Sequence, residues 1–355
     1  MSIKKIAEMA GVSYSTVSRV LNDPSYKCSS EEVRSRILSA ARELNYVPNE
    51  AARNLRLGVE PGRRVLYIGI LVTRTESANV DPFFSELTRM TEGEIHRSMC
   101  ILSNIWYRSA FSSEDEPDES HERFAREMLN SLEHAPDGLV IIGKCVPAAV
   151  KILRKRFRYI VSINRNSTNY EIDEVTCDGR KIAQTAVEYL IRLGHRRIAY
   201  AGDCHNEARY RGYRETLFKY GLDSDIDYSI DIRQSEEHGY KAMEQLAQRK
   251  NPPTAIYCAN DIIAIGMLRW LGKNRSRYYS PSVISSDDIE EAQYTKPMLS
   301  TVRLPKDDMA KFALYLLLDR INGGHRAVAR IELEGTLILR ESCSPPDDAS
   351  EHKRP

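Results

Sequence analysis

The chain has 355 residues, and its 51 Lys and Arg against 50 Asp and Glu give a net charge of +1 at pH 7. This length is too great for one small core and suits two or three domains. The near-zero charge excludes a molecule whose whole surface is a basic coat for nucleic acid. Residues 1–64 nevertheless carry 11 Lys and Arg against 7 Asp and Glu, so the basic excess lies at the amino-terminal end.

Membrane insertion and export are not expected from this sequence. No run of eighteen or more apolar residues occurs, and no apolar run follows Lys4 and Lys5 as a signal peptide would require. The seven cysteines are scattered, odd in number and never form a C-x-x-C pair, which favours reduced thiols and argues against a zinc site. We therefore expect a cytoplasmic protein with no metal or cofactor.

The first 22 residues, MSIKKIAEMAGVSYSTVSRVLN, have the pattern of two short helices joined by a tight turn. One face of the first helix is apolar or small, Gly11 breaks the chain, and Ser13 can cap the second helix. The second helix has an apolar inner face and a polar, cationic outer face. The inner residues are Val17, Val20 and Leu21, and the outer residues are Tyr14, Ser15, Ser18 and Arg19. This pattern predicts a helix-turn-helix that docks in a DNA major groove, although spacing alone also allows an ordinary amphipathic hairpin.

Two short segments follow before the pattern of the sequence changes at Val65. PNEAARNLR, from Pro48, spans about two helical turns, which is marginal for an isolated helix in water. GVEPGRR, residues 58–64, holds two glycines and a proline and is expected to be a linker. A later acidic segment, Glu114 to Glu119, is interpreted as a solvated loop and helix start, with a cation or partner site as the alternative.

From Val65 the sequence alternates apolar runs of strand-forming residues with helical stretches. The runs are VLYIGILV, CILSNIW, GLVIIG, YIVSIN, RIAYAG, TAIYCAN and SVISSD. This alternation predicts doubly wound parallel sheets. The expected fold class is therefore an all-α helix-turn-helix headpiece followed by an α/β core.

Polar residues follow several of these runs, at the edge of a parallel sheet where ligands bind. They are Asn164 and Arg165, Asn260 and Asp261, and Asp287 and Asp288, with Arg209 opening the helix after RIAYAG. Helix capping is the ordinary alternative for residues in such places, and Asp261 in particular can serve purely as a cap.

In combination, the motifs resemble those of LacI-type repressors. IAEMAGVSYSTVSRVLN, LNYVPNEAARNLR, DPFFSEL, DGLVIIG, YLIRLGHRRIAYAG, RYRGYRETL, PPTAIYCANDIIAIGMLRWL, SSDDIE, STVRLP and RESCSPP occur in the order that this family shows, over roughly residues 2–346. The resemblance implies a headpiece at 1–57 with a hinge helix at about 48–57, a linker at 58–64, a core at 65–343 and a polar tail at 344–355. It also implies two core halves of periplasmic binding protein type. The first half is then about 65–162 and 291–321, and the second is 163–290 and 322–343.

The resemblance assigns the DNA contacts residue by residue. Base contacts fall on Tyr14, Ser15 and Arg19, and phosphate contacts on Ser13, Thr16, Ser18, Asn49, Arg53 and Arg56. Ala52 allows paired hinge helices to approach closely, and Leu55 enters the minor groove as an apolar wedge that kinks DNA. Packing of Leu55 against the core is the alternative. The implied partner is double-stranded DNA with a pseudo-palindromic operator, bound by a homodimer because the tail has no leucine heptad for a tetramer.

The resemblance assigns the small-molecule site to a second set of residues. They are Asp81, Phe83, Phe84, Asn164, Arg209, Asn260 and Asp287. Arginine, amide and carboxylate together suit a cluster of hydroxyl groups, and the two phenylalanines either offer a flat face to a pyranose or a base, or belong to the core. Asn164 stands where the family usually has aspartate, and Ser286 replaces a usual aromatic residue.

The predicted function is sequence-specific regulation of transcription, as a repressor of carbohydrate-utilisation genes whose operator affinity is switched by a small sugar. A purine or nucleoside corepressor, or control by a partner protein, is the alternative. An enzyme is not expected, because the H-x-x-x-H, G-x-S-x-G, GxGxxG and P-loop patterns are missing.

Overall fold

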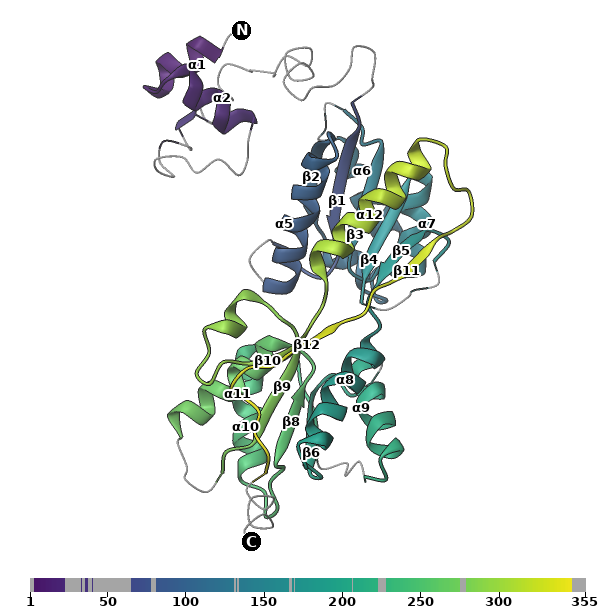
Figure 1. Cartoon of the computed structure of the whole chain (residues 1–355). Helices are drawn as coiled ribbons and strands as arrows, with labels where there is room; N and C mark the ends of the chain where they lie inside the picture. The colour runs from purple at the N-terminus through teal and green to yellow at the C-terminus, as the bar shows by residue number, and fades with distance from the viewer. Residues whose placement is uncertain are drawn as a thin grey trace. The chain divides into compact units, whose positions relative to one another are not determined.

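The computed structural model of the chain describes residues 3–22, 33, 36–37, 40, 65–77, 81–130, 132, 134–165, 168, 170–205, 207–222, 228–274 and 279–346. The chain divides into two compact units, Met1–Val65 and Leu66–Pro355 (Figure 1). The expected hinge helix, the linker and residues 347–355 of the tail lie outside the described residues. In the described part of the chain, no helix is long and apolar enough to span a membrane.

The amino-terminal unit contains the predicted helix-turn-helix. Helix α1 (Ile3–Ala10) and helix α2 (Tyr14–Asn22) are joined by a turn in which Gly11 has a φ of 65°. Ser13 caps α2 as expected, since its Oγ accepts a hydrogen bond from the Thr16 amide at 3.1 Å. The two helices and a following segment share a small apolar core of Ile6, Ala7, Ala10, Val17, Val20, Ile37 and Ala40.

The described part of Leu66–Pro355 contains two six-stranded sheets (Figure 1). The first sheet has the order β2-β1-β3-β4-β5-β11 and is parallel throughout. Its strands are β1 (Tyr67–Val72), β2 (Ile101–Tyr107), β3 (Gly138–Ile142), β4 (Ile160–Asn164), β5 (Asp173–Thr176) and β11 (Arg330–Glu332). The second sheet has the order β7-β6-β8-β9-β10-β12, and only β12 is antiparallel to its neighbour. Its strands are β6 (Ile198–Gly202), β7 (Ser229–Asp231), β8 (Ala255–Cys258), β9 (Ser282–Asp287), β10 (Ser300–Arg303) and β12 (Thr336–Ile338).

Helices cover both faces of the first sheet, which explains why its central strands are continuously apolar. On one face lie α5 (Pro82–Arg97) and α12 (Lys306–Ile321), and on the other lie α6 (Asp118–Asn130) and α7 (Pro147–Arg156), which the short turn η1 (Ser109–Ser112) precedes. Successive residues of β1 point to opposite faces: Ile70 packs in the core with α5 and α12, whereas Leu71 packs in the core with α6 and α7. Helix α6 begins within the acidic segment, at Asp118, as predicted.

The second sheet is covered in the same way. Helices α8 (Gly179–Arg192) and α9 (Ala208–Lys219) form one layer, and α10 (Glu236–Ala247) and α11 (Asp261–Lys273) form the other, while the turn η3 (Glu290–Gln293) follows β9. Helices α10 and α11 touch through glycines. A Cβ at Gly239 would lie 2.1 Å from the Ile263 oxygen, and a Cβ at Gly266 would lie 2.1 Å from the Glu236 oxygen.

The predicted boundaries of the two core halves are wrong in three places. Strand β10 pairs with β9 in the second sheet, although 291–321 was expected in the first half. Strands β5 and β11 pair with each other in the first sheet, although 163–290 and 322–343 were expected in the second half. The chain therefore crosses between the subdomains three times: after β5, after β10 and after β11. These strands are three or four residues long, so they contain no apolar run from which their pairing could be predicted.

Replacement of Gly266 by Ala should destabilise the core, because its Cβ would meet backbone atoms of α10 that cannot move aside cheaply. We expect a loss of about 1–3 kcal/mol in the free energy of unfolding, measured by urea denaturation. Gly272→Ala is the matched control on the same helix, since nothing lies within 4 Å of its Cβ. It should be neutral or stabilising by up to about 1 kcal/mol. Equal effects of the two substitutions would contradict the close helix contact.

Candidate functional site

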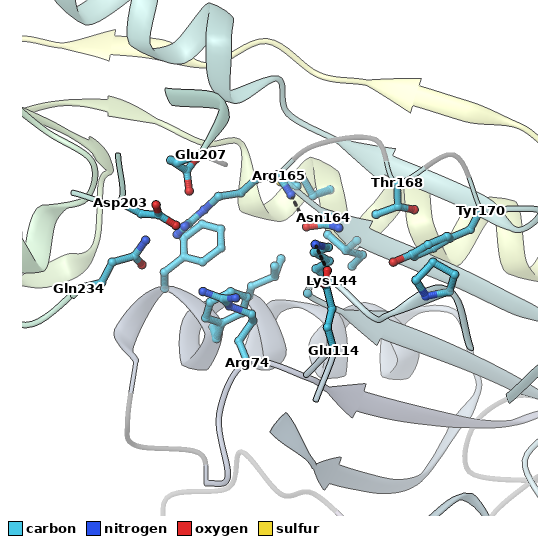
Figure 2. Close-up of a pocket in the computed structure, with 17 residues that line it drawn as sticks. Arg74, Glu114, Lys144, Asn164, Arg165, Thr168, Tyr170, Asp203, Glu207 and Gln234 are labelled. Atoms are coloured by element: carbon cyan, nitrogen blue, oxygen red, sulfur yellow. Dashed lines mark hydrogen bonds and ion pairs between the residues drawn. The ribbon is translucent and has the colours of Figure 1, made fainter. Parts of the chain in front are cut away.

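A cavity of about 530 Å³ lies between the carboxyl edges of the two sheets, with walls from both subdomains (Figure 2). Its polar lining from the first subdomain is Arg74, Glu114, Lys144, Asn164, Arg165, Thr168 and Tyr170, and from the second subdomain Asp203, Glu207 and Gln234. This is the edge at which open parallel sheets bind ligands. The size suits one or two sugar rings or a nucleoside.

Arg165 crosses the cavity and joins the two subdomains. It follows β4 of the first sheet, and its Nη2 donates to Oδ2 of Asp287, the last residue of β9 in the second sheet, at 2.8 Å. Its guanidinium carbon lies 4.4 Å from the ring centre of Phe83, a cation–π distance. In Figure 2 the side chain extends toward Asp203 and Gln234. Arg165 therefore links the subdomains through an ion pair and covers the Phe83 ring.

Asp287 is held in a strained and incompletely bonded state. Its φ is 117°, in a region that side chains rarely adopt, and its Oδ1 is buried with no hydrogen-bond partner. Burial raises the pKa of Asp287 to about 6, against the opposing effects of Arg165 and Arg209. A carboxylate in this condition can gain a hydrogen bond when the groups around it rearrange.

Arg209 is a buried cation held by its neighbour Glu207. The guanidinium donates from Nε to Oε1 at 2.9 Å and from Nη2 to Oε2 at 3.1 Å, and Nη1 donates to the Ala259 oxygen. Burial favours a higher pKa for Glu207, but the charge and hydrogen bonds of Arg209 outweigh it and bring the pKa to about 2. The pair therefore stays ionised, with Glu207 facing the cavity and Arg209 behind it.

Asn260 and Asp261 have different roles from those expected. Asn260, not Asp261, caps α11, since its Oδ1 accepts from the Ile263 amide at 3.1 Å. The interpretation of Asp261 as a cap is wrong. Its carboxylate accepts from the Ser285 hydroxyl at 2.6 Å and from the Thr301 hydroxyl at 2.7 Å, and so ties α11 to β9 and β10. Burial raises the pKa of Asp261 to about 7, with a further contribution from the charge of Asp287.

The expected ligand residues divide between the cavity wall and the layer behind it. Phe83, Phe84 and Asn164 line the cavity, and the two phenylalanines are also buried in the core, as one of the two interpretations expected; their contact with a ligand ring stays a prediction. The other four lie behind the wall. Asp81 caps α5, Arg209 is covered by Glu207, Asn260 donates to the Gln234 side chain at 3.2 Å, and Asp287 is covered by Arg165.

The sequence analysis missed most of the polar wall, namely Arg74, Lys144, Thr168, Tyr170, Asp203, Glu207 and Gln234. Arg74 stands two residues after β1, so the rule of polar residues at strand ends would have found it. Glu207 stands two residues before Arg209, where a local charge pair was visible. Gln234 lies in a loop between β7 and α10 and carries no such signal.

The predicted DNA-contacting residues are described only in part. Tyr14 is 54% exposed, and Ser15 is exposed beside it. The Ser13 hydroxyl is already used by the Thr16 amide and lies 2.7 Å from the Thr16 hydroxyl. The remaining members of the set lie outside the described residues: the side chains of Ser18 and Arg19, and all of Asn49, Ala52, Arg53, Leu55 and Arg56.

Comparison with known families finds similarity over both units. Residues 2–49 match the model for bacterial regulatory proteins of the lacI family, and residues 187–343 match a periplasmic binding protein-like domain. The chain is 30% identical over 351 residues to the transcriptional repressor CytR of Escherichia coli, covering 96% of each chain.

Solved structures show the same fold. A transcriptional regulator CelR–cellobiose complex is similar with a TM-score of 0.67 and 25% identity, over 97% of this chain and 100% of that one. The lac repressor dimer bound to operator is similar with a TM-score of 0.66 and 23% identity, over 97% and 99% of the two chains.

The buried Asp261 should make the stability of the core fall as pH rises. Its pKa is raised in the folded state, so between about pH 4 and pH 7 the folded chain holds a proton that the unfolded chain has released. The free energy of unfolding should therefore decrease across this window, by on the order of 4 kcal/mol from this group. In Asp261→Asn that contribution disappears, because a neutral amide replaces the titrating group. Urea denaturation at several pH values measures the slope.

The exposed Asp307 supplies the control for this measurement. Asp307→Asn should retain the wild-type decrease, whereas Asp261→Asn should reduce it to the part that the raised pKa of Asp287 contributes. Parallel curves for wild type and Asp261→Asn would show that the carboxyl stays ionised in the folded state.

Proposed function

Because the chain belongs to the lacI family of bacterial regulatory proteins, we propose that it is a transcriptional repressor whose affinity for its operator is changed by a sugar bound in the core. The single observation that carries the proposal is the polar cavity between the two subdomains, whose walls belong to both. A ligand there contacts two bodies at once and can change the angle between them. The CelR relative binds cellobiose, which supports a sugar as the ligand.

The headpiece supplies the operator contacts in this proposal. Tyr14 and Ser15 begin α2 and are exposed, so they can reach base edges when α2 enters the major groove. Arg19 would grip a guanine, and Leu55 would enter the minor groove from a paired hinge. The lac repressor dimer on its operator supports a homodimer on a pseudo-palindromic site.

The cavity supplies the switch. The ion pair between Arg165 and Asp287 spans the two subdomains. For the cleft to close on a hydroxyl-rich ligand, Arg165 must therefore share its hydrogen bond to Asp287 with the ligand or break it. The ligand can then satisfy the unpaired oxygen of Asp287 and stack on Phe83. We expect a coupling of about 1–3 kcal/mol between ligand and operator, or roughly 5- to 150-fold in affinity. The direction, release or corepression, is the outcome to be measured.

Binding, rather than catalysis, accounts for the site. The relatives are transcription regulators, and Arg165, Glu207 and Asp81 are engaged in ion pairs or a helix cap that hold the walls of the cavity. We propose that the chain is not an enzyme and acts in the cytoplasm.

The direct test is to select a duplex from a random library with the full chain and to measure its affinity by fluorescence anisotropy. Tyr14→Ala should weaken binding to the selected duplex about tenfold or more, because one base contact is worth about 1–3 kcal/mol. Its affinity for unselected duplex, which rests on phosphate attraction, should change little.

Met9→Ala is the matched control, since Met9 is 45% exposed in the same headpiece but lies on α1. It should bind the selected duplex as the wild type does. Selection that enriches no sequence would contradict the proposed function. If a nucleoside changes the operator affinity and a sugar does not, the proposed repressor function stands and the proposed ligand is wrong.

A further inference from the structure

Cationic groups gather on one side of the cavity. The guanidinium groups of Arg74 and Arg165 border it, and Arg209 lies just behind the wall. Figure 2 shows Arg74 and Arg165 directed into the same space from different segments of the first subdomain. Burial lowers the pKa of Arg74, and the charges of Arg165 and Arg209 lower it further, so the three groups act on one another.

Two of these three cations have a carboxylate partner, and the third does not. Arg165 pairs with Asp287, and Arg209 pairs with Glu207. Among the described residues, Arg74 makes no ion pair or hydrogen bond through its side chain. Lys144, a further cation of the cavity wall, has Glu114 at 3.8 Å.

The acidic groups that act on Arg74 are committed to other partners. Both oxygens of Glu207 accept from Arg209. Oδ1 of Asp81 accepts from the amides of Phe83 and Phe84, at 3.0 and 3.4 Å, because it caps α5. Glu207 cannot turn to Arg74 without leaving the buried Arg209 unpaired, and Asp81 is held at the start of α5 by its cap.

The aliphatic part of the Arg74 side chain nevertheless packs against the backbone. This stem lies against Gly143, the residue that follows β3, where a Cβ would lie 2.8 Å from Arg74 Cγ and 2.7 Å from Thr73 Oγ1. Gly143 has a φ of 105°, so two features of that position suit glycine. The backbone thus makes room for the arginine stem, and the exposed part of the side chain faces the cavity.

We propose that the ligand of this cavity is an anionic sugar, whose carboxylate or phosphate pairs with Arg74 while its hydroxyl groups meet the walls around Phe83 and Gln234. This inference rests on the proposed function and names the chemical class of its ligand. A planar guanidinium binds either oxyanion through two parallel hydrogen bonds. A neutral sugar would leave Arg74 near the like charges of Arg165 and Arg209 and would give it no ion pair of its own.

The test compares each neutral sugar with its acid and phosphate, by calorimetric titration of the full chain. Galactose is compared with galacturonate. Glucose is compared with glucuronate, gluconate and glucose 6-phosphate. At least one anion should bind about tenfold or more tightly than its neutral parent, the gain of a charge-assisted hydrogen bond. Binding of galacturonate, glucuronate or gluconate identifies a carboxylate as the anion, and binding of glucose 6-phosphate identifies a phosphate.

Arg74→Met should remove the preference for the anion, and Arg74→Lys should retain part of it, because Lys keeps the charge without the fork. Arg126→Met, an exposed arginine of α6 away from the cavity, is the control and should bind as the wild type does. The melting temperature of each unliganded variant checks that it is folded.

Equal or tighter binding of a neutral parent, binding of no probe, or an Arg74→Met variant that still prefers the anion would overturn this inference. Each of these outcomes leaves the proposed function standing if the chain still recognises a selected duplex. Loss of sequence-specific DNA binding in the wild type would instead overturn the proposed function itself.

Discussion

The ion pair between Arg165 and Asp287 is the interaction on which the arrangement of the core depends. It joins Arg165, which follows β4 of the first sheet, to Asp287, the last residue of β9 in the second sheet, and its side chains are only 12% and 3% exposed. Two charges taken out of water are stabilising only while they stay together, so removing Arg165 would leave the buried charge of Asp287 without this partner. The strained backbone of Asp287 and its unpaired oxygen reduce the stability of this state. The two subdomains are therefore joined by an ion pair in which one carboxylate oxygen has no hydrogen bond.

A second set of contacts joins the two subdomains near the end of β9. Lys306, at the start of α12, donates to the backbone oxygens of Asp287 and Asp288 at 3.2 and 2.9 Å and pairs with Glu86 of α5. Glu86 also accepts from the Glu290 amide at 2.8 Å. These bonds join the first sheet's helices to the end of β9, close to the crossing between β10 and α12. The end of β9 is thus bonded directly to helices of the first subdomain.

The sequence predicted what depends on local pattern and missed what depends on pairing in space. The apolar runs located β1 and the other central strands, and Ser13 located the start of α2. The exchange of β10 and β5 between sheets was not predictable, because each strand is short and its partner lies far along the chain. In the same way, the sequence located Asn260 and Asp287 at strand ends, but it did not predict that other side chains lie between them and the cavity. Arg165 was noted only as a neighbour of Asn164, since nothing local indicates that its partner lies 122 residues away.

The central claim is that the Arg165–Asp287 pair holds the two subdomains together until a ligand replaces it. Electron–electron double resonance tests this directly, with spin labels attached through noncanonical amino acids at exposed positions Arg126 of α6 and Lys241 of α10. The wild-type chain should give one narrow distance distribution, and Arg165→Gln should broaden it and shift its mean, because Asp287 loses its partner. Distributions that coincide for wild type and Arg165→Gln would contradict the account.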